Sequence, residues 1–342
     1  MKRIAWKIVK TVFLAGFLGF MIMAVIKNDI FKDLWHGPKN WFYILLGLSC
    51  YFVSVGVTFT RWFFLVRAVG IPVRLLEAIR IAFLALFVSM LPMGAIVGGD
   101  LFKAWMLGKV QTGKGAENLA SIMIDRFFGL FAMFFYVTVA ACLSGISSMD
   151  DVVMQRLFMG TLVTTLGFAA LAVILLFCPD AIIRKMIAFL GRIPYLGGFL
   201  QRLTQAIRYY RSKPWVLALA FFMGMVSQTF LATSLHLFGI ALFEHFHSYA
   251  QNLAIIPLCI ATIFIPVAIG PLEVALDWFY THTFMDDGSV AKSGVGFVVA
   301  LGFRLYVLGL AGCGWLYYVF YRPTIDDTFP AELLDETGYK QD

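Results

Sequence analysis

Charged residues are scarce in this sequence of 342 amino acids. Aspartate, glutamate, lysine and arginine make up 14% of the chain, against about 25% in ordinary soluble domains. Hydrophobic residues make up 61%, which excludes the soluble globular and disordered classes. Runs without a charged residue approach or exceed the ~20 residues that cross a bilayer, at 11–26, 41–60, 127–143, 157–178 and 215–243. The sequence therefore predicts an all-α, polytopic integral membrane protein.

Features that would support catalysis or a cofactor are also lacking. The five cysteines show no paired spacing and lie in or beside apolar runs, which indicates small core residues rather than disulfides or metal ligands. No ATP-binding motif is present, so transport by this chain would be passive or coupled to protons or ions. We therefore predict no enzymatic activity, no catalytic residue, no metal site and no cofactor.

The net charge is +7, and basic residues gather beside the apolar runs. Such residues mark the cytoplasmic side of membrane spans and contact anionic lipid, so the charge does not predict nucleic-acid binding. The basic N-terminus lacks a cleavage site after 11–26, which favours an uncleaved first span with its start inside. Residues 179–214 hold seven basic residues and one acid, so this loop is predicted to be cytoplasmic. Arg61, Arg67, Arg74 and Arg80 are placed inside by the same count.

Two apolar stretches are interrupted by proline and glycine, and each ends on a carboxylate. The first, 89–100, ends on Asp100, and the second, 264–273, ends on Glu273. An interrupted helix in a bilayer leaves backbone groups that only protein or a hydrated cavity can satisfy. Paired interruptions of this kind indicate the binding site of a transporter. The predicted break or hinge residues are Pro92, Gly98, Gly99, Pro266, Gly270 and Pro271.

The cytoplasmic loop fixes the predicted topology. The loop 179–214 stays inside only if the first interrupted stretch, 89–100, enters and leaves the membrane from the cytoplasm. The second stretch, 264–273, must then enter and leave from the outside, where residues 244–252 also lie. We predict about six full crossings plus two re-entrant broken-helix hairpins in an inverted repeat. The predicted parts are a single transmembrane domain at 1–322, inverted halves at 41–178 and 215–322, interfacial helices at 179–214, and a disordered acidic tail at 323–342. Both termini are predicted to be cytoplasmic.

Charged residues near the first break are candidates for binding a headgroup. Asp100 has the pattern of a helix N-cap, with Lys103 in the first turn. A helix N-terminus offers free N–H groups and a partial positive charge that suit a phosphate. An ordinary cap at a membrane boundary is the alternative. Asp125 and Arg126 open another apolar helix and project about 100° apart, so each is expected to meet a different partner, at the inner interface or in a cavity.

The second break carries a matching set. Pro271 suits the first turn of a helix, which places Glu273 near its start, and Asp277 follows on the same face. Arg304 lies well inside the apolar run 294–321, where an unpaired charge costs at least ~2.5–3.5 kcal/mol. Glu273 or Asp277 is its most plausible partner. A structural ion pair and a substrate contact both remain open.

These motifs resemble a known family. Leu91-Pro92, Gly98-Gly99-Asp100, Ile124-Asp125-Arg126-Phe127-Phe128-Gly129-Leu130 and Ile265-Pro266-Val267-Ala268-Ile269-Gly270 are similar to the flippase-like transmembrane domain of lysylphosphatidylglycerol synthases. The similarity runs over nearly the whole chain apart from the tail. The resemblance implies a membrane domain that moves or handles modified lipids between leaflets, here as a stand-alone member without the aminoacyl transferase domain of full synthases.

The leading functional hypothesis is a lipid translocator in the cell (inner or plasma) membrane. Its partners would be membrane lipids, namely an anionic or aminoacylated phospholipid or a polyprenyl lipid or glycolipid, and a homo-oligomer is left open. The predicted headgroup-binding residues are Asp100, Lys103, Asp125, Arg126, Glu273, Asp277 and Arg304. One alternative is a lipid-linked glycosyltransferase that uses Asp150-Asp151 or Asp286-Asp287, and another is a secondary transporter of small solutes or ions.

Overall fold

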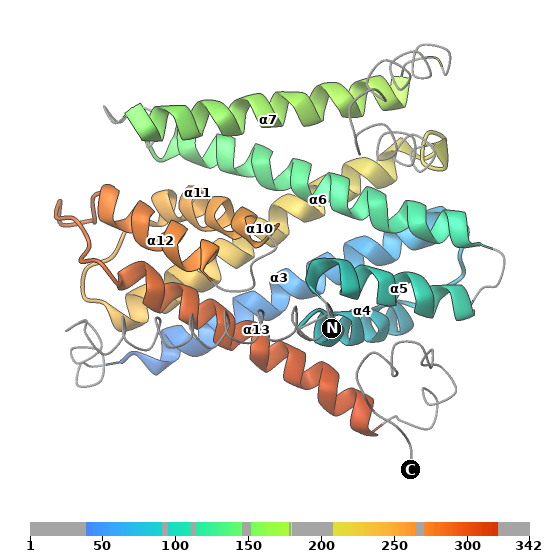
Figure 1. Cartoon of the computed structure of the whole chain (residues 1–342), viewed down its shortest axis with the longest axis horizontal. Coiled ribbons are helices and arrows are strands. Elements are labelled where there is room, and N and C mark those ends of the chain that lie inside the picture. Colours follow the sequence, from blue (N-terminus) through green and yellow to red (C-terminus); the bar gives the residue numbers. More distant parts are fainter. Residues whose placement is uncertain are drawn as a thin grey trace, which may run out of the picture. The chain divides into compact units, whose positions relative to one another are not determined.

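A computed structural model describes residues 39–90, 95–110, 114–145, 152–177, 179, 208–264 and 270–320. These residues form helices joined by short connections, with one isolated bridge between Phe284 and Val290 and no strand in the described ranges (Figure 1). The helices are α3 (Trp41–Ala68), α4 (Leu75–Met90), α5 (Ala95–Val110), α6 (Gly115–Leu143), α7 (Val152–Phe177), α10 (Pro214–Leu242), α11 (Tyr249–Ile260), η2 (Ala261–Phe264), α12 (Pro271–His282) and α13 (Val295–Phe320). The predicted all-α class is confirmed.

Five of these helices are long and apolar enough to cross a membrane: α3, α6, α7, α10 and α13. The remaining helices are shorter, with α4 and α5 at 16 residues each and α11 and α12 at 12 each. The first predicted crossing at 11–26, most of the cytoplasmic loop 179–214 and the acidic tail 323–342 lie outside the described residues.

The chain divides into two compact units. The first unit contains Met1–Val55, Phe131–Phe168 and Met225–Tyr306, and the second contains Gly56–Leu130, Ala169–Gly224 and Val307–Asp342. Each of the five long helices contributes residues to both units. The two predicted breaks fall in different units, because residues 91–94 belong to the second and residues 265–269 to the first.

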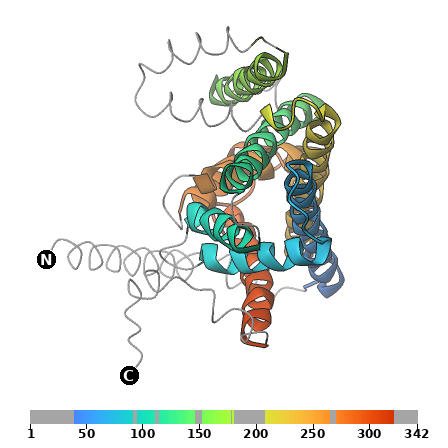
Figure 2. The same ribbon diagram turned by 90° about the vertical axis from the view of Figure 1, so that its right-hand side faces the viewer.

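In the second unit, α4 and α5 lie side by side (Figure 1 and Figure 2). Leu84 and Ala85 of α4 and Phe102 of α5 form a buried apolar cluster between them. Gly99 allows this close approach, because a Cβ at that position would lie 2.8 Å from the carbonyl oxygen of Ala85. The two helices therefore form a packed pair on either side of the undescribed residues 91–94.

In the first unit, α11, η2 and α12 form the corresponding group around residues 265–269. The N-terminus of α13 packs closely against the backbone of α12, since a Cβ on Gly296 would overlap the backbone of Asp277. Across the same unit, Tyr306 stacks on Tyr51 at 6.0 Å and donates a hydrogen bond to the carbonyl of Ile44 at 3.0 Å. These contacts join α12, α13 and α3 within the unit.

We predict that Gly296→Ala destabilises the protein, because the added methyl group would overlap the α12 backbone. Overpacking of this kind costs about 1–3 kcal/mol. Gly309→Ala on the same helix is the matched control, since nothing lies within 4 Å of its added Cβ and alanine favours helix over glycine. Thermal unfolding of the purified chain should show a lower Tm for Gly296→Ala alone. Equal Tm values for the two variants would contradict the close approach of α13 to α12.

Candidate functional site

A bidentate ion pair joins α5 to α6 in the second unit. Arg126 donates from Nε to Oδ2 of Asp100 at 2.6 Å and from Nη2 to Oδ1 at 2.7 Å. The Arg126 side chain remains 41% exposed, while that of Asp100 is 18% exposed. Planar two-point pairing of this kind fixes both side chains. The helix that follows the first break is thereby tied to a long membrane helix through its own carboxylate.

Asp100 is not the N-cap of a helix, so this prediction is wrong. α5 begins at Ala95, which places Gly98, Gly99 and Asp100 inside it. The Gly-Gly pair resembles a helix start, but Gly99 serves the packing of α5 on α4 and leaves the helix continuous. Packing thus overrides the weak helix propensity of glycine. The predicted break residue Pro92 lies outside the described residues.

A second ion pair in the same unit joins α3 to α6. Arg61 Nε donates to Asp125 Oδ1 at 2.8 Å, and the two side chains are only 9% and 7% exposed. Gly129, one turn after Asp125, leaves room for the guanidinium, because a Cβ there would lie 2.9 Å from Arg61 Nη2. Asp125 and Arg126 therefore meet different partners, as predicted. Sequence reasoning missed Arg61, which it grouped with the basic residues flanking the span.

Lys103 adds a fifth charge to this cluster. Its side chain is buried and its Nζ lies 5.1 Å from the ring centroid of Trp62. Among the described residues, Lys103 makes no hydrogen bond or ion pair, although it is electrostatically coupled to Asp125, Arg126, Asp100 and Arg61. When Lys103 is protonated, the cluster holds three cations and two carboxylates. Because burial makes this charged form of Lys103 costly, an approaching anion would stabilise it.

The corresponding pair in the first unit joins α12 to α13. Arg304 Nε donates to Glu273 Oε1 at 3.1 Å, with Glu273 1% exposed and Arg304 28% exposed. Glu273 Oε2 also accepts from the backbone N–H of Gly270 at 2.8 Å. Gly270 has a φ of 121°, a value that favours glycine, and Pro271 is the first residue of α12. Of the two carboxylates that sequence offered to Arg304, the structure selects Glu273.

Asp277 has a different set of partners. Its Oδ1 accepts from the backbone N–H groups of Gly294 at 2.6 Å and Gly296 at 3.2 Å, and its Oδ2 accepts from the Ser293 hydroxyl at 3.1 Å. A carboxylate at a helix start satisfies backbone donors that otherwise lack partners. Asp277 therefore holds the N-terminus of α13, and its predicted role in headgroup binding gains no support from this geometry.

The two units share one arrangement of charges. In each unit, the helix after the predicted break carries a carboxylate that binds an arginine of the next long helix: Asp100 with Arg126, and Glu273 with Arg304. In both pairs the arginine is more exposed than the carboxylate. The predicted break residue Pro266 lies outside the described residues, as Pro92 does. The sequence pattern of paired breaks thus has a counterpart in paired side chains.

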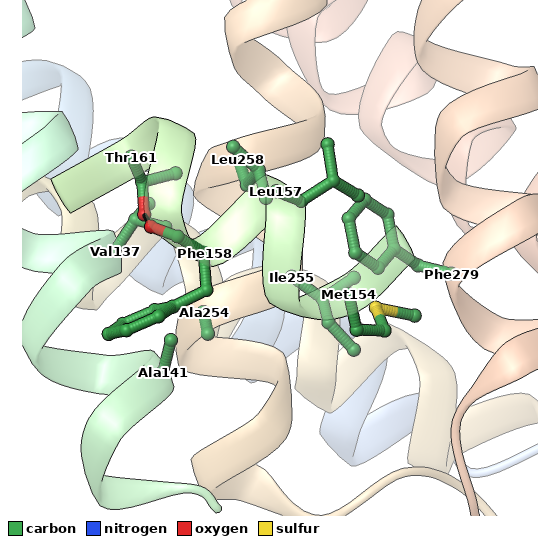
Figure 3. A pocket seen from close by; sticks show the side chains of 10 residues that line it. All are labelled: Val137, Ala141, Met154, Leu157, Phe158, Thr161, Ala254, Ile255, Leu258 and Phe279. Atoms are coloured by element: carbon green, nitrogen blue, oxygen red, sulfur yellow. Dashed lines mark hydrogen bonds between the residues drawn. The ribbon is translucent and has the colours of Figure 1, made fainter. Parts of the chain in front are cut away.

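An apolar pocket lies apart from these charges in the first unit (Figure 3). Its lining comes from α6, α7, α11 and α12, and Thr161 supplies the one polar side chain. None of the predicted headgroup-binding residues reaches it. The lining residues are Val137, Ala141, Met154, Leu157, Phe158, Thr161, Ala254, Ile255, Leu258 and Phe279. Its surface offers no charge to a headgroup.

Of the two acidic pairs predicted for the glycosyltransferase alternative, the structure describes Asp286-Asp287. Asp150 and Asp151 lie outside the described residues. Asp287 Oδ1 accepts from the backbone N–H and the hydroxyl of Ser289, and these hydrogen bonds lower the pKa of the Asp287 carboxyl. Within the described part of the chain, no three histidine, cysteine, aspartate or glutamate residues are grouped to hold a metal ion.

We predict that Asp125→Asn destabilises the protein more than the double change Arg61→Gln with Asp125→Asn. The single change leaves the Arg61 charge buried without its partner, and breaking one side of a buried pair costs about 3–5 kcal/mol. Thermal unfolding of both single variants and the double variant forms a double-mutant cycle. Additive losses across this cycle would show that Arg61 and Asp125 do not depend on each other.

Comparison with known proteins places the chain in one family. Residues 7–313 match the model of the lysylphosphatidylglycerol synthase TM region. Because this match covers most of the chain, the protein belongs to that family and is a multi-pass membrane protein with a lipid-related function. The chain matches no curated protein and no solved structure.

Proposed function

We propose that this protein moves a lipid headgroup between the two leaflets of a membrane. The observation that carries the proposal is a carboxylate on the helix after each predicted break that pairs with an arginine of the next long helix, once in each unit. The family, a transmembrane region of lipid synthases, supports a lipid as the substrate. Such transport needs no bond to be made or broken, so no catalytic residue is required.

The exposed arginines are the groups that would contact the headgroup. Arg126 uses Nε and Nη2 for Asp100, and Arg304 uses Nε for Glu273. Their remaining N–H groups have no partner among the described residues. Since a guanidinium carries five donors, each arginine is able to hold its carboxylate and a phosphate oxygen together. The carboxylate keeps the arginine charge neutralised while no lipid is bound.

The second-unit cluster favours an anionic headgroup. Arg61 and Arg126 are each paired with a carboxylate, and Lys103 is left as the additional cation. A phosphate would neutralise this charge in a region where an unpaired ion is costly. The proposed substrates are therefore an anionic or aminoacylated phospholipid, or a polyprenyl or glycolipid that carries a phosphate.

Alternating access would arise from the two helix pairs. We propose that α4–α5 and α11–α12 are re-entrant hairpins and that, with the five described long helices and the span predicted at 11–26, they complete six crossings in an inverted repeat. Pro92 and Pro266 would be the hinges. The basic loop 179–214 supports cytoplasmic termini in the cell membrane.

The proposal predicts that both ion pairs are needed for transbilayer movement. Proteoliposomes containing the full chain and headgroup-labelled phosphatidylglycerol would be treated with a membrane-impermeant quencher. Quenching beyond the outer-leaflet fraction should occur with the unchanged protein. Asp100→Asn and Glu273→Gln should each slow it about tenfold or more, because the arginine loses the carboxylate that positions it and that replaces the headgroup when the lipid leaves; a tenfold change corresponds to ~1.4 kcal/mol.

Asp287→Asn is the control for these two variants, because Asp287 lies in an exposed turn and contacts Ser289 and His245 rather than an arginine of either pair. It should leave the quenching rate unchanged. Labelled lysylphosphatidylglycerol and a labelled polyprenyl phosphate would be tested in parallel. If the unchanged protein moves none of these lipids, or if both site variants move them at the normal rate, the proposed function is wrong.

A further inference from the structure

A buried polar network in the first unit joins the start of α11 to the end of α12, whereas Glu273 lies at the start of α12. Asn252 of α11 is at its centre and is fully buried. Tyr280 of α12 donates to Asn252 Oδ1 at 2.7 Å, and Asn252 Nδ2 lies 3.0 Å from the backbone carbonyl oxygen of His247 and 3.0 Å from Nδ1 of His236 on α10. This network joins α10, α11 and α12 within the unit.

The partners of Asn252 fix the tautomer of His236. The amide nitrogen of Asn252 must face the carbonyl oxygens of His247 and Ser248, because its oxygen accepts from Tyr280. Nδ2 therefore donates toward His236, so His236 Nδ1 is an acceptor and carries no proton. A proton on this nitrogen would oppose one N–H to another and remove the contact.

His247 is the second titratable ring of the network. Its side chain is fully buried, stacks on Tyr280 with 4.5 Å between ring centroids, and places Nε2 3.1 Å from the carbonyl oxygen of Thr283. Nδ1 is buried and makes no hydrogen bond to the described residues. Burial lowers the pKa of His247 and outweighs the opposing effects of the Thr283 and Tyr280 carbonyls and of Asp286.

Among the described residues, Asp286 is the carboxylate that acts electrostatically on both rings. The rings of Phe246 and Tyr249 pack against His236. Because His236 Nδ1 must accept from Asn252 and the fully buried His247 ring is costly to charge, the network is fully formed above the ordinary histidine pKa of 6.5. Its stability then falls as the pH drops below that value, since the unfolded chain binds more protons.

We propose that His236, His247, Asn252 and Tyr280 form a proton-sensitive latch that holds α11 and α12 against α10 and releases them in acid. The sequence predicts that residues 244–252 face the outside, so the latch would respond to the external pH. That this latch regulates lipid movement through α11 and α12 rests on the proposed function. Opening of the latch is measurable without any lipid.

The test is hydrogen–deuterium exchange of the full chain in nanodiscs at pH 7.5 and pH 5.0, corrected for the intrinsic effect of pH on exchange. Protection of the amides in Tyr249–Ile260 should fall about tenfold at pH 5.0, the effect expected from losing one or two hydrogen bonds. The double variant His236→Gln with His247→Gln should abolish this fall, since glutamine does not titrate and retains donor and acceptor atoms.

His245→Gln with His282→Gln is the matched control, because both of these histidines are exposed and lie in the same unit. It should keep the tenfold fall. Tyr280→Phe removes the donor to Asn252 and should lower protection already at pH 7.5, which tests the latch even if the glutamine variant fails to fold. The latch would be refuted if the unchanged protein showed equal protection at both pH values. It would also be refuted if the double variant His236→Gln with His247→Gln kept the tenfold fall. Failed lipid movement with normal exchange behaviour would refute only the proposed function.

Discussion

The structure depends on ion pairs that neutralise charged side chains inside an apolar protein. Three such pairs are buried or half-buried: Arg61 with Asp125, Arg126 with Asp100, and Arg304 with Glu273. Each pair joins two helices within one unit. Since an unpaired charge at the centre of a bilayer costs at least ~2.5–3.5 kcal/mol, the pairs also restrict how these helices are able to pack. The same interactions therefore position the helices and hold the groups that would bind a headgroup.

Hydropathy was enough to predict the all-helical class, because a charge-free run of about 20 residues has few alternatives in a membrane. One ion pair was also predictable. Arg304 lies alone in a long apolar run, and the carboxylates that follow Pro271 were the evident partners. Choosing between Glu273 and Asp277 required coordinates, since the choice depends on Asp277 accepting hydrogen bonds from the first residues of α13.

The remaining pairs show why sequence reasoning failed elsewhere. Arg61 and Asp125 lie 64 positions apart, and Arg61 precedes other arginines that suggest an interfacial flank. No local sequence pattern links Arg61 to Asp125. The structure explains Gly129 of the Asp-Arg-Phe-Phe-Gly motif, because the Arg61 guanidinium packs against it. Asp100 was misread because a Gly-Gly-Asp sequence has the local pattern of a helix start, whereas contact with α4 makes the helix continuous.

The balance of charge distinguishes the two units in a way that bears on transport. In the first unit Glu273 and Arg304 neutralise each other, and Asp277 is occupied by backbone donors. In the second, Lys103 is additional to two complete pairs. Under the proposed function, the second-unit cluster would hold an anionic headgroup more tightly than the neutral Glu273–Arg304 pair of the first unit, because a phosphate would neutralise the additional charge on Lys103. This difference in affinity would decide which unit the headgroup occupies. Net movement would still follow the difference in lipid concentration between the leaflets, because unequal binding sites alone supply no energy for transport.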